Sequence, residues 1–187
     1  MVTLEEFRQK IEEATNKTHP RDHTQLVDSL KDIYSHSIKC LSSPLTSDRY
    51  APIIIDAKED CFLYVFKDIF SHEMLKEFKR VLDISKMHYE DIAIRLISEG
   101  ILELHNSWKD DDHVVVYFNN SIPVHFGKID KRAIVSKWGM VHVWMHGLWE
   151  VPLSYGNTVK FSDGQVNQTV FWKAIMSWIN SDSIKKE

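Results

Sequence analysis

Two side chains of this 187-residue chain have the chemical types and the order needed for nucleophilic catalysis. Cys61 begins an apolar run that continues to Phe66, and His125 follows much later in a strand-like segment. The positive end of a helix dipole stabilises a thiolate at a helix start. The thiolate is the attacking species, and a histidine from another element commonly acts as its base. The two residues therefore predict a cysteine hydrolase, and the alternative is that both are core residues.

The elements that must position this pair are predicted to be helices first and strands later. Thr3 and Glu6 form a capping-box pattern for a first helix that ends before Pro20. Further helices are predicted over residues 24–41, 74–82, 89–98 and 169–179, and strands over 101–105, 113–118, 122–126, 133–137 and 158–161. The predicted fold class is α+β, with a helical N-terminal part and a small antiparallel sheet. Its parts are a helical appendage (1–50), a hydrolase-like domain (51–165), and a C-terminal amphipathic helix with its tail (166–187).

The composition of the chain limits the classes of partner that are expected. Hydrophobic residues make up 43% of the chain, which is enough for a packed core, and the formal net charge of −4 gives no basic excess for nucleic acid. No apolar run is long enough to span a membrane, so no membrane partner is expected. The acidic, amphipathic N-terminus does not resemble a secretory signal, which predicts a cytoplasmic protein unless another export route operates. In that compartment Cys40 and Cys61 are expected to be free thiols.

Several short motifs together resemble the papain-like cysteine hydrolases of the NlpC type, and in particular a poorly characterised bacterial and phage-associated family. The motifs are Asp60-Cys61-Phe62, the strand 114–118, His125-Phe126-Gly127, Ser136-Lys137-Trp138-Gly139 and residues 146–156, which end in Tyr155-Gly156. The resemblance implies a papain-like core that hydrolyses an amide bond in a peptide, a protein or a peptidoglycan-type peptide, without a cofactor.

Further roles are predicted around the pair. Ser136, on the strand after His125, would orient it. The segment 136–156 is rich in tryptophan and glycine and is predicted to form one wall of the groove, with Trp138, His146 and Trp149 lining it. The alternative is that the tryptophans have a purely structural role in the hydrophobic core. The oligomeric state and the substrate side chains are not fixed by the sequence.

Two departures leave a non-catalytic reading open. The residue that orients the base is usually His, Asn or Gln, whereas this chain offers Ser136 and Lys137, and an ammonium cannot accept a hydrogen bond. Asp60 places a negative charge beside the thiol, which opposes thiolate formation. The alternative function is therefore a binding module with the same fold.

Two other site types are weaker alternatives. His142 and His146 have the i, i+4 spacing of zinc ligands on a helix, but glycines flank them and no third ligand is near in sequence, so no metal is expected. Residues 74–105 follow the helix–helix–strand order of a winged helix. The second helix of that segment is acidic and carries one arginine, which does not suit DNA binding.

Overall fold

The computed structural model describes residues 3–17, 23–37, 53–54, 61–85, 89–131, 133–138 and 142–183. These residues form an α+β fold built on one antiparallel sheet with the strand order β1-β5-β4-β3-β2-β6. The strands are β1 (Ile53–Ile54), β2 (Val114–Asn119), β3 (Ile122–Asp130), β4 (Ala133–Trp138), β5 (His142–His146) and β6 (Thr158–Ser162). The helices are α1 (Leu4–Lys17), α2 (His23–Ser37), α3 (Cys61–Phe66), α4 (His72–Ser85), α5 (Tyr89–Ser98) and α6 (Gln168–Ser183), with a 3₁₀ turn, η3 (Leu153–Tyr155). The predicted α+β class is confirmed.

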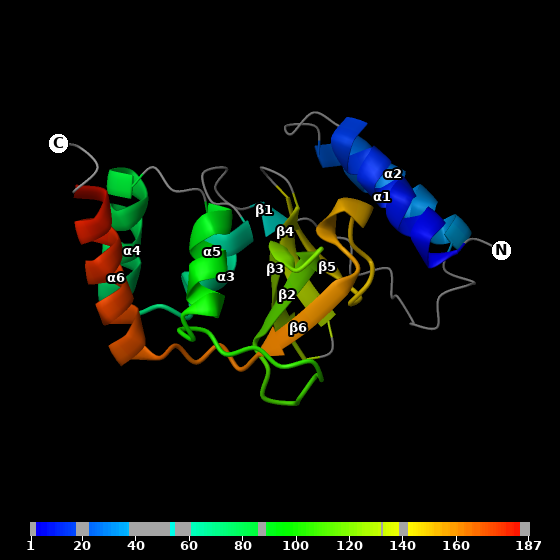
Figure 1. Cartoon of the computed structure of the whole chain (residues 1–187). Helices are drawn as coiled ribbons and strands as arrows, with labels where there is room; N and C mark the ends of the chain where they lie inside the picture. The colour runs from blue at the N-terminus through cyan, green and yellow to red at the C-terminus, as the bar shows by residue number, and fades with distance from the viewer. Residues whose placement is uncertain are drawn as a thin grey trace.

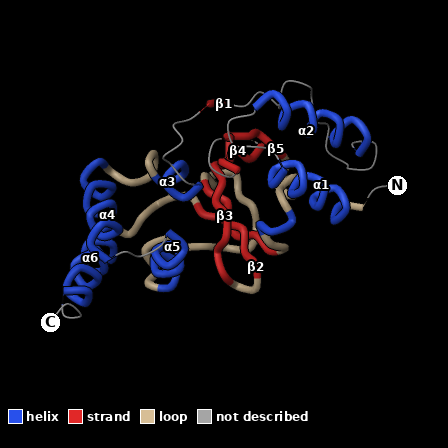
Figure 2. The backbone as a smooth tube through the Cα atoms, turned by 90° about the horizontal axis from the view of Figure 1, so that it is seen from above, coloured by secondary structure: helices blue, strands red, loops and turns tan. Residues whose placement is uncertain are grey.

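Helices cover both faces of the sheet, which gives the molecule its layers. Figure 1 shows α1 and α2 on one side of the strands and α3, α5, α4 and α6 on the other side, and Figure 2 shows the same order from above. Alternate residues of each strand point to opposite faces. The sheet therefore separates two cores.

The two cores are named here by the helices that cover them. The α3–α6 core holds the aromatic cluster of α3 and α4 and the strand residues that face it, among them Phe62, Phe66, Phe78, Val114, Val116, Phe126 and Val135. The cap core holds the buried residues beneath α1 and α2, among them Phe7, Ile11, Val115, Tyr117, Ile134, Trp138 and Trp144. Because both faces of β2 are covered, its sequence is a continuous apolar run from Val114 to Phe118.

The helix ends follow the predicted capping signals. Thr3 and Glu6 exchange hydrogen bonds of 2.8 and 3.1 Å, which is the reciprocal capping box. The Ser71 hydroxyl accepts from the Met74 N–H at 3.2 Å at the start of α4. Gly100, with φ of 68°, ends α5 in the left-handed conformation that glycine adopts at low cost. The predicted Thr3–Glu6 capping box is confirmed.

An irregularity in β3 decides where His125 points. The register between β2 and β3 shifts at Tyr117/Phe118, because Tyr117 pairs with His125 and Phe118 pairs with Pro123. Val124 is the extra residue of this bulge. Directly opposed residues of an antiparallel pair project to the same face, so the His125 side chain lies on the cap side with Tyr117.

One strand was not predicted from the sequence, and one predicted strand is not formed as such. β5 lies inside the segment 136–156, which was predicted to be a groove wall, and it pairs with β4 along its whole length. The predicted strand 101–105 is reduced to two isolated bridges, Leu102 with Val166 and His105 with Phe161. The end of the second predicted helix, Cys40, Asp60 and Gly139 lie outside the described residues.

Candidate functional site

Cys61 and His125 do not meet. Cys61 begins α3 and packs, partly buried, against the α3–α6 core. Its neighbour Phe62 contacts Phe126 from that side, with ring centroids 5.2 Å apart. The His125 ring lies on the other face, stacked on Tyr155 with centroids 3.9 Å apart. The sheet therefore stands between the two side chains, and the predicted nucleophile–base pair does not form in this structure.

His125 has the environment of a neutral core residue. It is 1% exposed, and its Nε2 has no hydrogen-bond partner among the described residues. Burial, with a smaller contribution from nearby His146, holds the pKa of His125 well below the ordinary value. An imidazole that resists protonation and is closed to solvent is not placed to act as a general base.

Ser136 bonds to a different histidine from the one predicted. Its Oγ lies 2.7 Å from Nε2 of His146, and the Nδ1 of His146 lies 2.7 Å from the carbonyl oxygen of Gly147. A carbonyl only accepts, so Nδ1 carries the proton and Nε2 accepts from the serine hydroxyl. The indole N–H of Trp138 donates to the same Oγ at 3.0 Å. Ser136 therefore positions His146, not His125.

In this contact a histidine nitrogen accepts from a serine hydroxyl, as in an activated nucleophile, but both side chains are buried away from solvent. Ser136 is 0% exposed and His146 is 1% exposed. Burial lowers the pKa of His146 to about 4, and the hydrogen bond to Gly147 opposes this shift. We therefore read the contact as a satisfied polar network of the cap core.

The predicted groove residues also belong to the cap side, away from Cys61. Trp138 and Trp144 pack against each other in the cap core with ring centroids 5.6 Å apart. Trp149 lies farther from this core, and the Arg8 guanidinium lies 5.6 Å from the centroid of its ring. The core alternative therefore holds for Trp138 and Trp144, while Trp149 lies at the edge of the cap.

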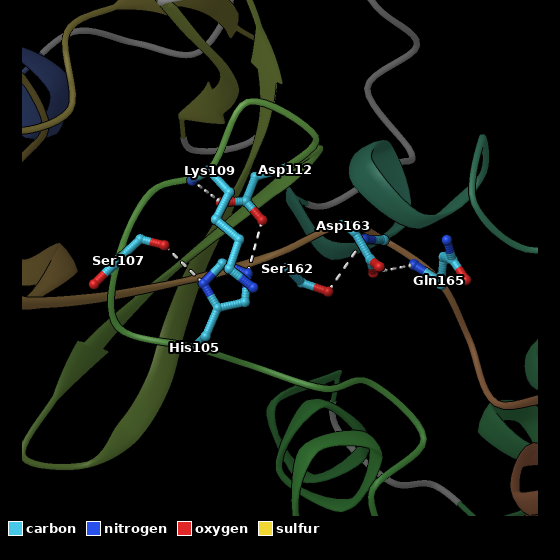
Figure 3. Close-up of polar contacts among 8 residues, drawn as sticks. His105, Ser107, Lys109, Asp112, Ser162, Asp163 and Gln165 are labelled. Carbon is cyan, nitrogen blue, oxygen red and sulfur yellow. Dashed lines mark hydrogen bonds and ion pairs between the residues drawn. The ribbon is translucent and has the colours of Figure 1, made fainter.

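A polar cleft lies elsewhere, beside the outer edge of β6. It encloses about 360 Å³ and lies between the segment 101–112 and the turn that follows β6. Figure 3 shows His105, Lys109 and Asp112 on one side and Asp163 and Gln165 on the other. The lining residues are Ile101, Glu103, His105, Lys109, Asp111, Asp112, Asp163, Gln165, Val166 and Asn167.

His105 and Asp112 hold the first side of the cleft. The His105 Nε2 lies 2.8 Å from Oδ1 of Asp112, and its Nδ1 lies 2.8 Å from the Ser107 carbonyl oxygen. Nδ1 donates to that carbonyl, and Nε2 faces the buried carboxylate of Asp112. The Asp112 side chain is fully buried, and its other oxygen accepts from the Lys109 N–H at 2.7 Å. These contacts join the two ends of the loop between His105 and Asp112.

The backbone fixes this loop to the sheet at both ends. His105 exchanges two 2.9 Å hydrogen bonds with Phe161, and the His113 N–H donates to the Ser162 carbonyl at 2.9 Å. Asp110 and Asp111 are exposed, whereas Asp112 is buried. The sequence feature that could have indicated this cleft is His105, which stands shortly before an Asp-rich turn.

A tight turn forms the second side of the cleft. The Asp163 carboxylate accepts from the Gln165 N–H at 2.8 Å, and the Ser162 hydroxyl accepts from the Gly164 N–H at 3.1 Å. Gly164 has a φ of 76°, which a residue with a Cβ adopts only with strain. Both sides of the cleft are thus held by local hydrogen bonds.

The lining favours cation binding over catalysis. Four carboxylates face one ammonium, and both nitrogens of the lining histidine are already engaged. No serine, threonine, cysteine or tyrosine is among the described lining residues. Within the part of the chain that the structure describes, no group of three or more His, Cys, Asp or Glu residues could hold a metal ion.

The described helices and the comparisons add no further constraint. No helix in the described ranges is long and apolar enough to cross a membrane. No protein family, curated protein or solved structure matches this chain.

Proposed function

We propose that this protein is a non-catalytic binding module, and that the cleft beside β6 receives a lysine or arginine side chain of a partner peptide or protein. The observation that carries the proposal is the excess of carboxylates in an open cleft of about 360 Å³. Opposite charge favours the ligand, and the cavity volume is within the range of small-molecule and side-chain pockets.

The shape of the lining supports a long cationic side chain. Val166 and Ile101 contribute apolar lining, whereas Glu103, Asp111 and Asp163 contribute carboxylates. Lysine and arginine have the matching character, because an apolar stem precedes a charged head. Of these three acids, Glu103 and Asp111 are exposed and Asp163 is partly buried.

A neighbouring cavity has a different balance of charge. It encloses about 380 Å³ on the far side of the Asp163–Gln165 turn and includes Lys128. The Lys128 ammonium pairs with Asp68 and lies 4.3 Å from the centroid of the Tyr64 ring. Since this second cavity already contains a cation, the cationic head of the ligand is expected in the first.

The predicted amide hydrolysis is not what we propose, because Cys61 and His125 lie on opposite faces of the sheet. The papain-like core and the relation to the NlpC-type family stay predictions. A protein or peptide partner likewise stays a prediction.

Binding of a fluorescent hexalysine peptide tests the proposal, with hexaglutamate as the comparison. Glu103→Gln combined with Asp163→Asn should weaken hexalysine binding about threefold to tenfold, because exposed ion pairs each contribute about 0.2–1 kcal/mol. Asparagine keeps an oxygen that can accept from the Gln165 N–H, so the turn is preserved. Added salt should weaken binding further.

The matched control is Glu73→Gln, which removes an exposed carboxylate from the first turn of α4, outside the cleft lining. It should bind hexalysine as the wild type does. Equal binding of hexalysine and hexaglutamate, or equal losses in the cleft and control variants, would refute the proposed cation site.

A further inference from the structure

The cap side of the molecule is fastened by a few long-range polar contacts. The guanidinium of Arg8 in α1 donates to the carbonyl oxygens of Val151 and Pro152, each at 3.2 Å, and also to Gly156. Glu12 accepts from the Ser154 N–H at 2.9 Å. These contacts tie α1 to the segment around η3, which itself covers His125 through Tyr155.

The side chains beneath this fastening include two buried imidazoles. His125 is stacked between neighbours of the cap core, and its Nε2 has no partner among the described residues. His146, two strands away, engages both ring nitrogens, with Ser136 Oγ and with the Gly147 carbonyl oxygen. A proton added to either ring would create a buried charge.

The charged and titratable groups around these rings offer little compensation. From β2, the Tyr117 hydroxyl donates to the Leu148 carbonyl at 2.8 Å, and burial raises the pKa of this phenol well above its ordinary value. From η3, Tyr155 presents a ring face. From α1, Arg8 is already cationic, and Glu150 accepts from the Gly147 N–H at 2.8 Å. A charge on His146 would itself oppose protonation of His125, because the two rings would repel each other.

The opposite core has no buried histidine among the described residues. Its buried side chains are apolar apart from Lys137, which shares that face with Val135 and Val143, and Ser162, which lies opposite Val114. The two histidines described at the start of α4 and just before β2, His72 and His113, are exposed. Acid should therefore act on one side of the sheet first.

We propose that α1 and the segment 147–156 form an acid-released cap, which stays closed over the sheet while His125 and His146 are neutral and opens when they are protonated. Opening uncovers Tyr117, Trp138 and Trp144, whereas the α3–α6 side stays folded. This inference is independent of the proposed cation cleft, which lies beside β6.

Hydrogen exchange of the full chain, corrected for the intrinsic effect of pH, tests the cap. Between about pH 7 and about pH 4, peptides from α1 and from residues 147–156 should lose protection about tenfold or more, while peptides from α4 and α6 keep theirs. Simultaneous loss of protection in α1, α4 and α6 would overturn the proposal, and this wild-type comparison needs no variant.

Two variants then assign the effect. His125→Phe keeps a flat ring for Tyr155 but cannot be protonated, so opening of α1 should move to lower pH. His72→Gln removes an exposed histidine at the start of α4 and should open as the wild type does. An opening pH that is unchanged in His125→Phe, or shifted equally in His72→Gln, would contradict the assignment to His125.

Discussion

At the scale of single residues, the face of the sheet to which a side chain points decides what it can do. Phe126 and His125 are neighbours in sequence, yet Phe126 packs with α3 and His125 packs with Tyr155. The resemblance to cysteine hydrolases rests on residue types and order, which do not specify the face. The bulge at Val124 adds one residue to β3, so simple alternation along the strand cannot be read from the sequence.

A thiol-reactivity experiment tests this separation. His125→Phe should leave the rate of Cys61 alkylation by iodoacetamide unchanged, because the sheet separates the imidazole from the thiol. A base in contact with the thiol would instead change the rate severalfold by altering the thiolate fraction. Cys61→Ser identifies the signal from Cys61 against that from Cys40. A clear slowing in folded His125→Phe protein would restore the predicted pair.

At the scale of elements, the ends of helices were the features best predicted from the sequence. The Thr3–Glu6 box, the Ser71 cap and the Gly100 end depend on contacts within one turn, so local sequence specifies them. α6 begins in the same way, since the Asn167 side chain accepts from the Val170 N–H at 3.1 Å.

Removing this cap should destabilise the protein. Asn167→Ala is expected to lower the free energy of unfolding by about 1 kcal/mol, because the Val170 N–H loses its side-chain partner. Urea unfolding followed by circular dichroism measures the change. Asn180→Ala, on an exposed position later in α6, is the control and should change stability by less than about 0.5 kcal/mol. Similar losses in both variants would show that the cap does not contribute.

Elements that depend on distant partners were harder to predict. β5 contains two histidines and a tryptophan, and its strand character comes from pairing with β4 and β1. The cleft beside β6 likewise depends on bridges between segments far apart in sequence, such as His105 with Phe161. The composition of the Asp-rich turn was visible, but the burial of Asp112 was not, because the chain that covers it is brought in by the fold.

At the scale of the whole molecule, two cores of different chemistry share one sheet. The α3–α6 core is dominated by stacked phenylalanines, such as Phe62 with Phe66 at 4.3 Å between centroids. The cap core contains a polar network around Ser136 and His146 as well as apolar residues. The cap core should therefore carry most of the response of stability to acid.

The pH dependence of folding follows from His146. Its folded-state pKa of about 4 lies below the ordinary value of 6.5. Between these values the unfolded chain binds a proton that the folded chain excludes, so stability present above pH 6.5 is lost as pH falls towards 4. The loss from this residue is on the order of 3 kcal/mol. Urea midpoints measured across this range should fall with pH, and His146→Gln should flatten the profile. A flat wild-type profile would contradict the prediction.

The hydrogen bonds of Arg8 have a consequence for the order in which the chain can fold during synthesis. Its hydrogen-bond acceptors lie 143, 144 and 148 residues further along the chain. During synthesis α1 emerges well before its partners at Val151, Pro152 and Gly156. Until then the apolar face that holds Phe7 and Ile11 has no sheet to cover. The only early partner available to this face among the described elements is α2, which meets it through Phe7 and Tyr34, so the helix pair must wait for the sheet that it covers.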